Sequence, residues 1–310
     1  MSYEIVIEST CDLNAELRKK YGIYEDYLHT VLYMPNGKEE EANLEWENYS
    51  VEEYFKLVKA NAGAIKTAFA TLGEFNRVIE PILKAGKDVM LFTISTGISG
   101  TYGGYLSHAE VLLEDYPDRK IAVIDTLKYS AASGLLAILA AQNKAKGMLL
   151  EDNIKWCNEN RHTIHEIGPM DDLRFLAKNG RIKAAKAFFG QLAGVQPVAD
   201  FTRDGKSEPL GTVKGDKAAN KIALDYLLKT AKNIEDQVII IAHSVRKERA
   251  EEFKKQLLEV AKPKAVELVS VGQSCGANIG PGLTAYFYVG DPLSEDHSKE
   301  NAMFNELKGN

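Results

Sequence analysis

The sequence is poor in cysteine and tryptophan, with three cysteines and two tryptophans in 310 residues. Cys11, Cys157 and Cys275 lie more than a hundred residues apart and form neither a CxxC pair nor a zinc-ligand spacing. An odd number of widely separated cysteines is typical of a reducing compartment. The N-terminal MSYEIVIEST passes directly into a strand pattern without a basic and then apolar leader. We therefore expect a cytoplasmic protein.

The chain also lacks an excess of positive charge and a long apolar run. Thirty-eight Lys and Arg against 44 Asp and Glu give a net charge of −6. General nucleic-acid binding depends on clustered positive charge, so this function class is excluded. The longest apolar stretch, Ala131–Ala141, is AASGLLAILAA, whereas a helix that spans a membrane needs about 20 residues. We expect no integral membrane segment.

The first half of the chain alternates apolar strands with helices. The length of 310 residues is about twice that of a typical domain. Strands are predicted at Glu4–Glu8, Asp88–Ser95 and Ile121–Thr126, and helices at Leu13–Tyr21, Ser50–Ala60, Thr71–Lys84, Thr101–Glu114 and Ser130–Ala145. Continuous apolar strands that alternate with helices are typical of parallel sheets covered on both faces. Residues 1–160 are therefore predicted to form a doubly wound, mostly parallel α/β domain.

The second half changes in character. Asp204-Gly205 supplies the turn of a β-hairpin between two predicted strands. The predicted strands are His162–Met170, Gln196–Phe201, Ser207–Val213, Gln237–His243, Ala265–Val271 and Thr284–Val289, and the predicted helices are Asp171–Lys178, Lys183–Leu192, Lys217–Thr230 and Arg246–Ala261. This pattern predicts a mixed α+β domain over residues 161–290. Residues 291–310 are expected to be a polar tail with at most a short surface helix.

The segment Ile94–Gly104 is rich in glycine and hydroxyl residues. It follows a buried strand and opens a helix, and open α/β sheets bind ligands at the carboxyl ends of parallel strands. Unpaired amides at a helix N-terminus also favour an anion. The segment matches neither a P-loop, a dinucleotide fingerprint nor a nucleophile elbow. From the pattern alone, anion binding and simple helix capping both remain open.

Three further segments carry unusual residue patterns. Gly276–Gly282 combines three glycines with a proline, which predicts a rigid turn with unusual backbone angles. In Lys66–Thr71, Thr67 ends a strand-like stretch, and Leu173–Ile182 contains two arginines. Taken singly, these side chains are typical of structural hydroxyls and of solvated or capping arginines.

Together these segments resemble the DegV family of bacterial fatty-acid-binding proteins. The resemblance covers residues 4 to 290 in the family's order. Five family patterns are found. D-S-T-x-D-L corresponds to Glu8–Leu13, I-S-S-x-L-S-G-T-Y to Ile94–Tyr102, and V-I-D-S…S-x-G to Val123–Thr126 with Ser130 and Gly134. L-R-F-L-x-x-x-G-R-I corresponds to Leu173–Ile182, and G-x-H-x-G-P-G to Gly276–Gly282.

The resemblance implies a lipid carrier without a cofactor. Such proteins hold one long-chain fatty acid in a tunnel between two domains, and in some bacteria they present its carboxylate to a separate fatty acid kinase. A monomer is the default expectation. The family's carboxylate ligands are a threonine, a serine of the I-S-S loop and a histidine. By position these become Thr67, then Ser95 or Thr96 with the adjoining Gly97, and Asn278.

The resemblance also implies residues for the lipid tail and for a partner. The apolar candidates near the motif segments are Phe69, Ile98, Leu135, Ile138, Phe188, Phe189 and Leu192, and each of them is equally suited to a plain core position. The candidates for contact with a kinase are Lys214, Arg174 and Arg181.

Three positions depart from the family pattern. Asn278 replaces the usual histidine, so it can donate a hydrogen bond but cannot carry a proton at neutral pH. Lys214 stands where kinase-coupled relatives tend to have arginine. A lysine keeps the positive charge but cannot form the bidentate hydrogen bonds of a guanidinium. Phe69 lies in a T-A-F-A-T stretch where a more polar T-S-Q-P-S is usual, and it could narrow the mouth of a pocket. The first two changes affect transfer to a kinase more than lipid binding.

The main alternative is an enzyme, either a hydrolase or a phosphotransferase, that uses the hydroxyl-rich loop on a small anionic substrate. Such an enzyme needs a base beside Ser95 or Ser99. Of the six histidines, only His243 ends a predicted strand, and it is equally typical of a structural residue. The histidines show no metal-ligand spacing, so we expect no metal. A lipid sensor is a third reading that the sequence does not separate from a carrier.

Overall fold

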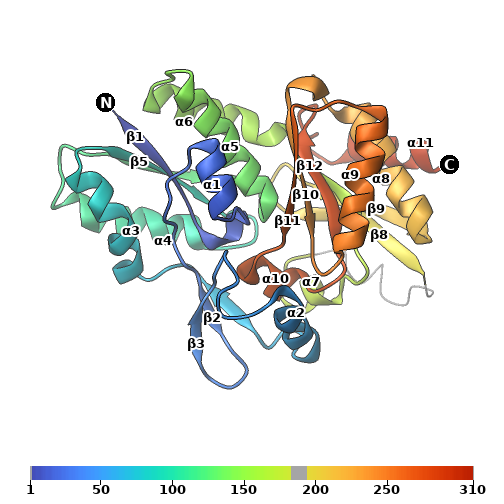
Figure 1. The fold of residues 1–310 in the computed structure, drawn as a ribbon, viewed down its shortest axis with the longest axis horizontal. Helices are drawn as coiled ribbons and strands as arrows, with labels where there is room; N and C mark the ends of the chain where they lie inside the picture. Colours follow the sequence, from blue (N-terminus) through green and yellow to red (C-terminus); the bar gives the residue numbers. More distant parts are fainter. Residues whose placement is uncertain (1, 183–193, 310) are drawn as a thin grey trace. The chain divides into compact units, whose positions relative to one another are not determined.

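The computed structural model describes residues 2–182 and 194–309, and these form two compact units (Figure 1). Unit 1 consists of Met1–Asn48, Ala64–Arg161 and Gly272–Cys275, and unit 2 of Tyr49–Gly63, His162–Val271 and Gly276–Asn310. The sequence analysis placed one boundary at residue 160. The chain contacts additionally assign residues 49–63 to unit 2 and residues 272–275 to unit 1.

Unit 1 is built on a parallel three-stranded sheet. Its strands are β1 (Tyr3–Ile7), β5 (Asp88–Thr93) and β6 (Ile121–Asp125), in the order β1-β5-β6. Val6, Leu91 and Val123 are aligned across the three strands and pack into one apolar cluster with two of the helices. The helices of this unit are α1 (Ala15–Tyr21), α3 (Leu72–Lys84), α4 (Thr101–Leu113), α5 (Ala131–Ala145) and α6 (Leu150–Asn160). The predicted parallel α/β arrangement is confirmed.

Helices α3 and α4 pack against one face of this sheet, and α5 packs against the other. The cluster around Val6 includes Phe75 of α3 and Tyr105 of α4. Every residue of α5 from Ala131 to Ile138 is buried, because α5 lies between β1 and α6. Coverage on both faces explains why the central residues of these strands are apolar.

Side-chain caps mark the starts of several helices. Ser50 and Glu53 form a capping box at the start of α2 (Val51–Ala60), and Thr71 caps α3. Helix α1 starts two residues later than the predicted helix Leu13–Tyr21: residues Ser9–Cys11 form the 3-10 turn η1, and Asn14 is the cap of α1. The left-handed conformation of Asp12 separates the turn from the helix.

A small antiparallel sheet in unit 1 was not predicted. It contains β2 (Val31–Tyr33), β3 (Glu39–Glu41) and β4 (Lys66–Ala68), in the order β3-β2-β4. Strands of three residues are too short to show an alternating pattern. Helix α6 was also missed, because its sequence LEDNIKWCNEN has a weak apolar stripe.

Unit 2 contains a mixed six-stranded sheet in the order β11-β10-β12-β7-β8-β9. Strands β10 and β11 are parallel, and the other neighbours are antiparallel. The strands are β7 (Ile164–Pro169), β8 (Val195–Phe201), β9 (Ser207–Lys214), β10 (Val238–His243), β11 (Ala265–Ser270) and β12 (Thr284–Val289). All six correspond to predicted strands, and the mixed α+β class is confirmed.

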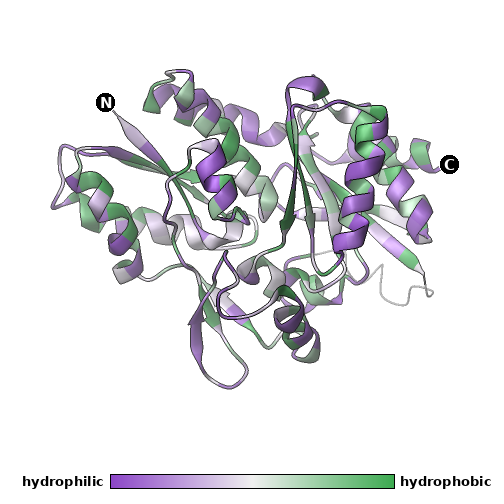
Figure 2. Cartoon of the chain, in the orientation of Figure 1, coloured by the Kyte–Doolittle hydropathy of each residue, from purple (hydrophilic) through white to green (hydrophobic). Residues whose placement is uncertain are grey.

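Three helices of unit 2 pack against this sheet: α8 (Asp216–Thr230), α9 (Lys247–Val260) and α11 (Ser298–Lys308). The unit also contains α2 and α7 (Arg174–Lys178). Figure 2 shows hydrophobic residues along most of β10 and β12 and hydrophilic stripes on α2 and α9. The predicted helix Lys183–Leu192 lies outside the described residues.

Two expectations at the C-terminal end need correction. Residues expected to form a turn after Gly276 instead belong to α10 (Gln273–Ile279), and the turn is confined to Gly280–Gly282, whose two glycines have positive φ angles. The expected polar tail contains α11, an 11-residue helix whose Phe304 is buried in the core of unit 2. Phe304, together with the partly buried Met303 and Leu307, packs this helix against the core.

Candidate functional site

The carboxyl ends of β1, β5 and β6 meet at one edge of the parallel sheet, where several polar residues are buried. Parallel strands place their following loops side by side, and α/β sheets bind ligands there. The buried polar residues of these three loops are Glu8, Ser9, Thr10, Asp12, Ser95, Thr126, Lys128 and Ser130. We describe this edge first as the candidate site.

Glu8 is the centre of the hydrogen-bond network at this edge. One carboxylate oxygen accepts from the Ile94 amide at 2.7 Å and from the Thr10 hydroxyl at 2.8 Å. The other accepts from the Tyr105 hydroxyl at 3.1 Å. Burial raises the pKa of Glu8 to about 6, and these three donors oppose that rise. Glu8 therefore joins the end of β1 to the loop after β5 and to α4.

Ser95 is fully buried in the loop after β5. Its amide donates to the Lys128 carbonyl at 2.8 Å, which ties the loop to the one after β6. Its hydroxyl oxygen accepts from the Gly97 amide at 2.9 Å, and its carbonyl accepts from the amides of Ile98 and Ser99. This tight turn fixes the Ser95 side chain at the carboxyl end of β5.

Thr96 is exposed, and its side chain is bonded to β6. The Thr96 hydroxyl donates to Asp125 at 2.6 Å, and the Thr96 amide donates to the same carboxylate at 3.2 Å. Neighbouring residues of one loop thus differ in role: Thr96 fastens the loop to β6, whereas Ser95 lies inside it.

The amides of this loop are largely committed to bonds within the unit. Those of residues 96 to 99 donate to Asp125, to the Ser95 hydroxyl or to the Ser95 carbonyl. At the start of α4, the Ser99 and Thr101 hydroxyls lie 2.8 Å apart, and the Thr101 amide donates to Ser99. The capping interpretation left open by the sequence therefore accounts for these groups, and an anion here would depend mainly on side-chain hydroxyls.

Thr67 is half-buried on β4, where it is paired with Leu32 of β2. Three residues further on, the Ala70 amide donates at 3.1 Å to the Tyr105 hydroxyl that itself donates to Glu8. The structure thus brings the segment that carries Thr67 and the loop that carries Ser95 to the same buried carboxylate.

A second buried carboxyl, Asp12, lies in the same loop as Glu8. It accepts from the Ser130 hydroxyl at the start of α5 and, at 2.9 Å, from the Gly272 amide. Burial raises its pKa to about 7. Asp12 and Ser130 both have positive φ angles, which are uncommon for residues other than glycine. Backbone strain of this kind gathers at functional sites.

The remaining carboxylate-binding candidate, Asn278, belongs to unit 2. It is half-buried on α10, in the part of that helix that unit 2 includes. The neighbouring carbonyl of Ala277 accepts from the Asn179 side chain at 3.4 Å. Asn278 is thus held on a helix and not on the glycine turn that the sequence predicted.

The tail-lining candidates lie in different environments. Leu135 and Ile138 are fully buried on α5, and Ile98 is half-buried in the loop before α4. Phe69 stands edge-on to Tyr105, with ring centroids 5.7 Å apart, and packs so closely on Gly104 that a β-carbon there would lie 2.5 Å away. The candidates Phe188, Phe189 and Leu192 lie outside the described residues.

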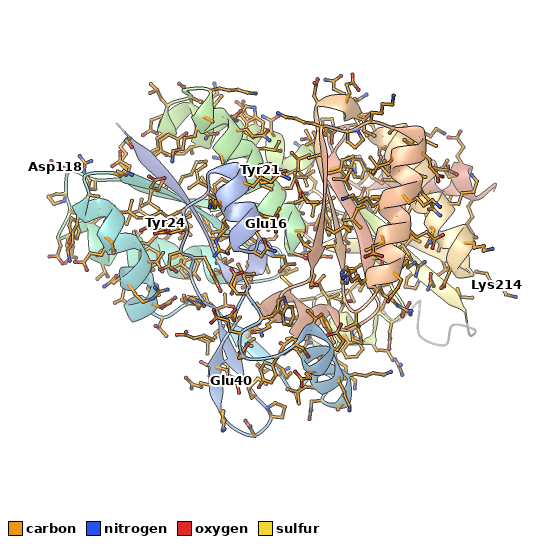
Figure 3. All side chains as sticks on the ribbon, viewed as in Figure 1. Glu16, Tyr21, Tyr24, Glu40, Asp118 and Lys214 are labelled. Carbon is orange, nitrogen blue, oxygen red and sulfur yellow. The ribbon has the colours of Figure 1, made fainter. Side chains whose placement is uncertain are left out.

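The candidate partner contacts are all in unit 2. Lys214 is exposed at the end of β9, and its side chain points away from the sheet (Figure 3). Arg174 is exposed and paired with Asp172 at 2.7 Å. Arg181 is half-buried, and its guanidinium donates to the Asn179 carbonyl.

Unit 2 has its own buried polar cluster, which sequence reasoning missed. His165 contacts Asp200 at 2.6 Å through Nδ1 and the Asp291 carbonyl at 2.7 Å through Nε2. The Tyr226 hydroxyl donates to Asp200 at 2.9 Å. A cavity of about 350 Å³ adjoins the cluster and is lined by His165, Tyr226, Thr230, Asp291, Pro292, Lys299, Glu300 and Met303. Burial raises the pKa of Asp200, but His165 and the Glu166 amide outweigh that effect, so the pKa lies below its usual range.

The enzyme alternative requires a base beside the hydroxyls of the loop. The bonds described above pair Ser95 with backbone groups and Ser99 with Thr101. Both histidines of unit 1 are engaged elsewhere: His29 contacts Glu74 at 2.6 Å, and His108 packs among aromatic rings. The contacts described for these two histidines are with Glu74 and with aromatic rings, not with Ser95 or Ser99.

The sequence analysis overlooked Glu8, Asp12 and Tyr105 as site residues. Glu8 and Asp12 stood inside a motif that was quoted for its resemblance alone. The signal that could have found them is an acidic residue directly after a buried strand, where it must either leave the core or collect donors. Tyr105 carried no such signal, because a tyrosine inside a helix is ordinarily a core residue.

Comparisons with known proteins place the chain in one family. A family model described as "Uncharacterised protein, DegV family" matches residues 2–291. A DegV domain-containing protein of Streptococcus pyogenes is 27% identical over 290 residues, which cover 94% of this chain and 99% of the relative. One from Clostridium perfringens is 31% identical over 217 residues, which cover 70% and 75% of the two chains.

Solved structures share the fold. A DegV lipid binding protein of Thermotoga maritima has a TM-score of 0.80 at 22% identity and covers 95% of this chain and 100% of its own. A DegV protein from Thermus thermophilus, described by its fatty acid binding, has a TM-score of 0.80 at 24% identity, with 93% and 100% covered.

A third structure is the Fatty Acid Kinase B3 protein of Streptococcus pneumoniae, loaded with linoleic acid. It has a TM-score of 0.77 at 20% identity, with 94% of this chain and 100% of its own covered.

Among the described residues, no helix is long and apolar enough to cross a membrane. With a family match over residues 2–291 and the same fold in these solved structures, this chain belongs to the DegV family.

Proposed function

We propose that this protein binds one long-chain fatty acid and acts as a carrier, not as an enzyme. Membership of the DegV family supports the proposal, together with the fatty acid binding named for the Thermus protein and the linoleic acid named for the Streptococcus pneumoniae protein. In this proposal the carboxylate is held by Thr67, Ser95 and Asn278, and the tail occupies an apolar tunnel.

Ser95 is the proposed donor from the loop after β5. The observation that carries this choice is the bond from the Thr96 hydroxyl to Asp125, which commits Thr96 to the sheet. Ser95 is buried at the carboxyl end of β5, where its hydroxyl oxygen accepts from the Gly97 amide. A hydroxyl that donates to a carboxylate makes a charge-assisted bond, which is the stronger kind.

The tail supplies the affinity in this proposal. Each buried methylene contributes about 0.8 kcal/mol, so a chain of about 14 methylenes gives a large surplus over the costs of ordering. The carboxylate contributes orientation, because burying an ionised group is favourable only where donors receive it. Leu135 and Ile138 are the tail-lining candidates on the best-buried helix.

The test compares Ser95→Ala with the matched control Thr96→Val. We expect Ser95→Ala to weaken binding of palmitate about ten-fold or more, since a hydrogen bond to a charged group is worth roughly 1.5–3 kcal/mol, and to leave binding of methyl palmitate nearly unchanged. Thr96→Val should affect neither ligand strongly. Kd values from tryptophan fluorescence or calorimetry decide the matter.

Equal losses for the acid and the ester would show that Ser95 does not hold the carboxylate. Lipid extraction of protein purified from a bacterial host gives an independent check, with fatty acid expected by mass spectrometry. A protein that carries no lipid and binds neither palmitate nor its ester would contradict the proposal as a whole.

We also propose that transfer to a fatty acid kinase is slower than in relatives that keep the histidine. Asparagine at position 278 cannot carry a proton, and Lys214 lacks the fork of an arginine. Asn278→His should therefore raise the turnover of bound palmitate by a fatty acid kinase, with binding of palmitate unchanged. Turnover that stays the same would show that the missing histidine is not limiting.

A further inference from the structure

Glu8 and the carboxylate of a bound fatty acid would lie close together, and this inference rests on the proposed function. The Glu8 carboxylate is fully buried and accepts from the amide of Ile94. Ser95, the proposed donor to the lipid, is the next residue. A second carboxylate bound at Ser95 therefore enters a region where a carboxylate has already been removed from water.

The groups that contact Glu8 are neutral donors and acids. Tyr105 from α4 and Cys11 from η1 are neutral acids whose pKa values Glu8 helps to raise. Asp12 and, from α10, Cys275 are further buried acids close to Cys11. Lys128, on the loop after β6, is also fully buried, and its carbonyl accepts from the Ser95 amide.

Two carboxylates in a shared, poorly solvated site cannot both stay ionised at little cost, so the pKa of one of them rises strongly. We infer that Glu8 and the fatty-acid carboxylate together hold one proton, so that binding of the anionic lipid takes up a proton from solution. The proton belongs to the pair and not to either oxygen alone.

The sign of the pH dependence follows from the two states of Glu8. Without lipid, burial places the pKa of Glu8 at about 6, so it is ionised at pH 7. Lipid binding raises that pKa. At pH values between the pKa without lipid and the pKa with lipid, each binding event takes up a proton from solution. The affinity for the anionic lipid therefore falls as the pH rises from 6 to 8, on the order of ten-fold for a coupling in the common range. A lipid with a neutral head group shows no such fall.

Glu8→Gln is the informative substitution, because glutamine copies the protonated acid. Its carbonyl oxygen can accept from Ile94 and Thr10, and its amide can donate to the Tyr105 oxygen, so the three existing bonds have counterparts. Asp12→Asn is the matched control. Asp12 is the other buried carboxyl of this loop, but its partners are Ser130 and Gly272.

The experiment is calorimetric titration with laurate at pH 7 in phosphate and in Tris, two buffers with different heats of ionisation. Free laurate is ionised throughout pH 6–8, since ordinary carboxyl pKa values lie near 4. We expect wild type and Asp12→Asn to take up a substantial fraction of one proton per laurate, and Glu8→Gln to take up almost none. 1-Dodecanol should bind without proton uptake in every variant. Laurate affinity should fall about ten-fold from pH 6 to 8 in wild type and stay level in Glu8→Gln.

Three results would overturn the inference. Laurate bound by wild type without proton uptake would mean that a cation such as Lys128 balances the pair, and the fatty-acid proposal would stand. Equal uptake in wild type and Glu8→Gln would place the proton elsewhere. Absence of binding of both laurate and 1-dodecanol would remove the proposed function and this inference with it. If Glu8→Gln does not fold, wild type decides alone: uptake with laurate and none with 1-dodecanol supports the inference, and equal uptake with both overturns it.

Discussion

Both units bury carboxylates among hydrogen-bond donors, and two of these carboxylates, Glu8 of unit 1 and Asp200 of unit 2, differ in their surroundings. Asp200 in unit 2 accepts from Tyr226 and two backbone amides and lies 2.6 Å from His165. Glu8 in unit 1 accepts from one amide and two hydroxyls, and none of these three donors is a histidine. The pKa of Asp200 is lowered, whereas burial raises that of Glu8 to about 6.

This difference separates a structural carboxylate from one suited to function. A buried carboxylate beside a cation is already neutralised, so a new charge nearby changes its protonation little. A buried carboxyl that only neutral donors stabilise has a pKa near neutrality and responds to a new charge nearby. Glu8 lies at the carboxyl end of a parallel strand, where ligands bind, whereas Asp200 lies near the end of β8 and is paired with the edge strand β9 of a mixed sheet.

The largest effect should come from breaking the balanced pair with Asp200→Asn. Asparagine can keep the bonds from the amides of Glu166 and Phe201, but it leaves His165 without its counter-charge. Removing one member of a buried ion pair costs roughly 3–5 kcal/mol. Urea unfolding at pH 7 should show this loss in the free energy of unfolding.

The control for that measurement is Asp204→Asn in the exposed hairpin turn, where the carboxylate contacts Thr202 and Lys206. Since this pair is largely solvent-exposed, the loss should stay below about 1 kcal/mol. Similar losses for Asp200→Asn and Asp204→Asn would mean that His165 and Asp200 do not form a charged pair.

The next effect is a gain in the free energy of unfolding, and it concerns Glu8. The folded-state pKa of Glu8 is about 6 against an ordinary value of 4.5, so Glu8 stabilises the fold fully below pH 4.5 and loses that contribution as the pH rises through 6. A shift of this size corresponds to about 2 kcal/mol. The stability of Glu8→Gln relative to wild type should therefore increase by about 2 kcal/mol between pH 4.5 and pH 7.5.

Urea unfolding of both proteins across this pH range gives that difference directly. Asp12 contributes a slope of the same sign, because burial raises its pKa as well, but it is present in both proteins and cancels. A difference that stays constant with pH would show that Glu8 is not a titrating buried acid.

Much of the fold could be predicted from local chemistry. The strands of both main sheets carry continuous apolar runs, and the capping box at Ser50 marks the start of α2 to the residue. The sequence pattern did not predict elements that are very short or that depend on contacts with distant residues. Strands β2 and β3 have three residues each, and Gly276, expected in a turn, lies within α10, where the close approach of Phe55 leaves no room for a side chain.

The candidate site could be predicted only as a set of segments. The motif resemblance pointed to the loop after β5, but it did not separate Ser95 from Thr96, because that choice depends on Asp125 at the end of another strand. Glu8 was visible as an acidic residue after an apolar strand, yet its network includes Tyr105, 97 residues away in the sequence. Contacts between distant segments leave no periodic trace in the chain.

The smallest effect comes from removing one donor to each carboxylate, with Tyr226→Phe and Tyr105→Phe. Asp200 keeps His165 and two amides after the first change, so the loss of unfolding free energy should be about 1 kcal/mol, with no change in its pH dependence between pH 5 and 8. Glu8 loses one of three donors to its ionised form after the second change, so its pKa should rise further and the pH-dependent loss of stability should move to higher pH. Unfolding curves at several pH values separate the two tyrosines. Profiles that shift alike would mean that the balance of charge around the two carboxylates is the same, and the contrast between the units would fail.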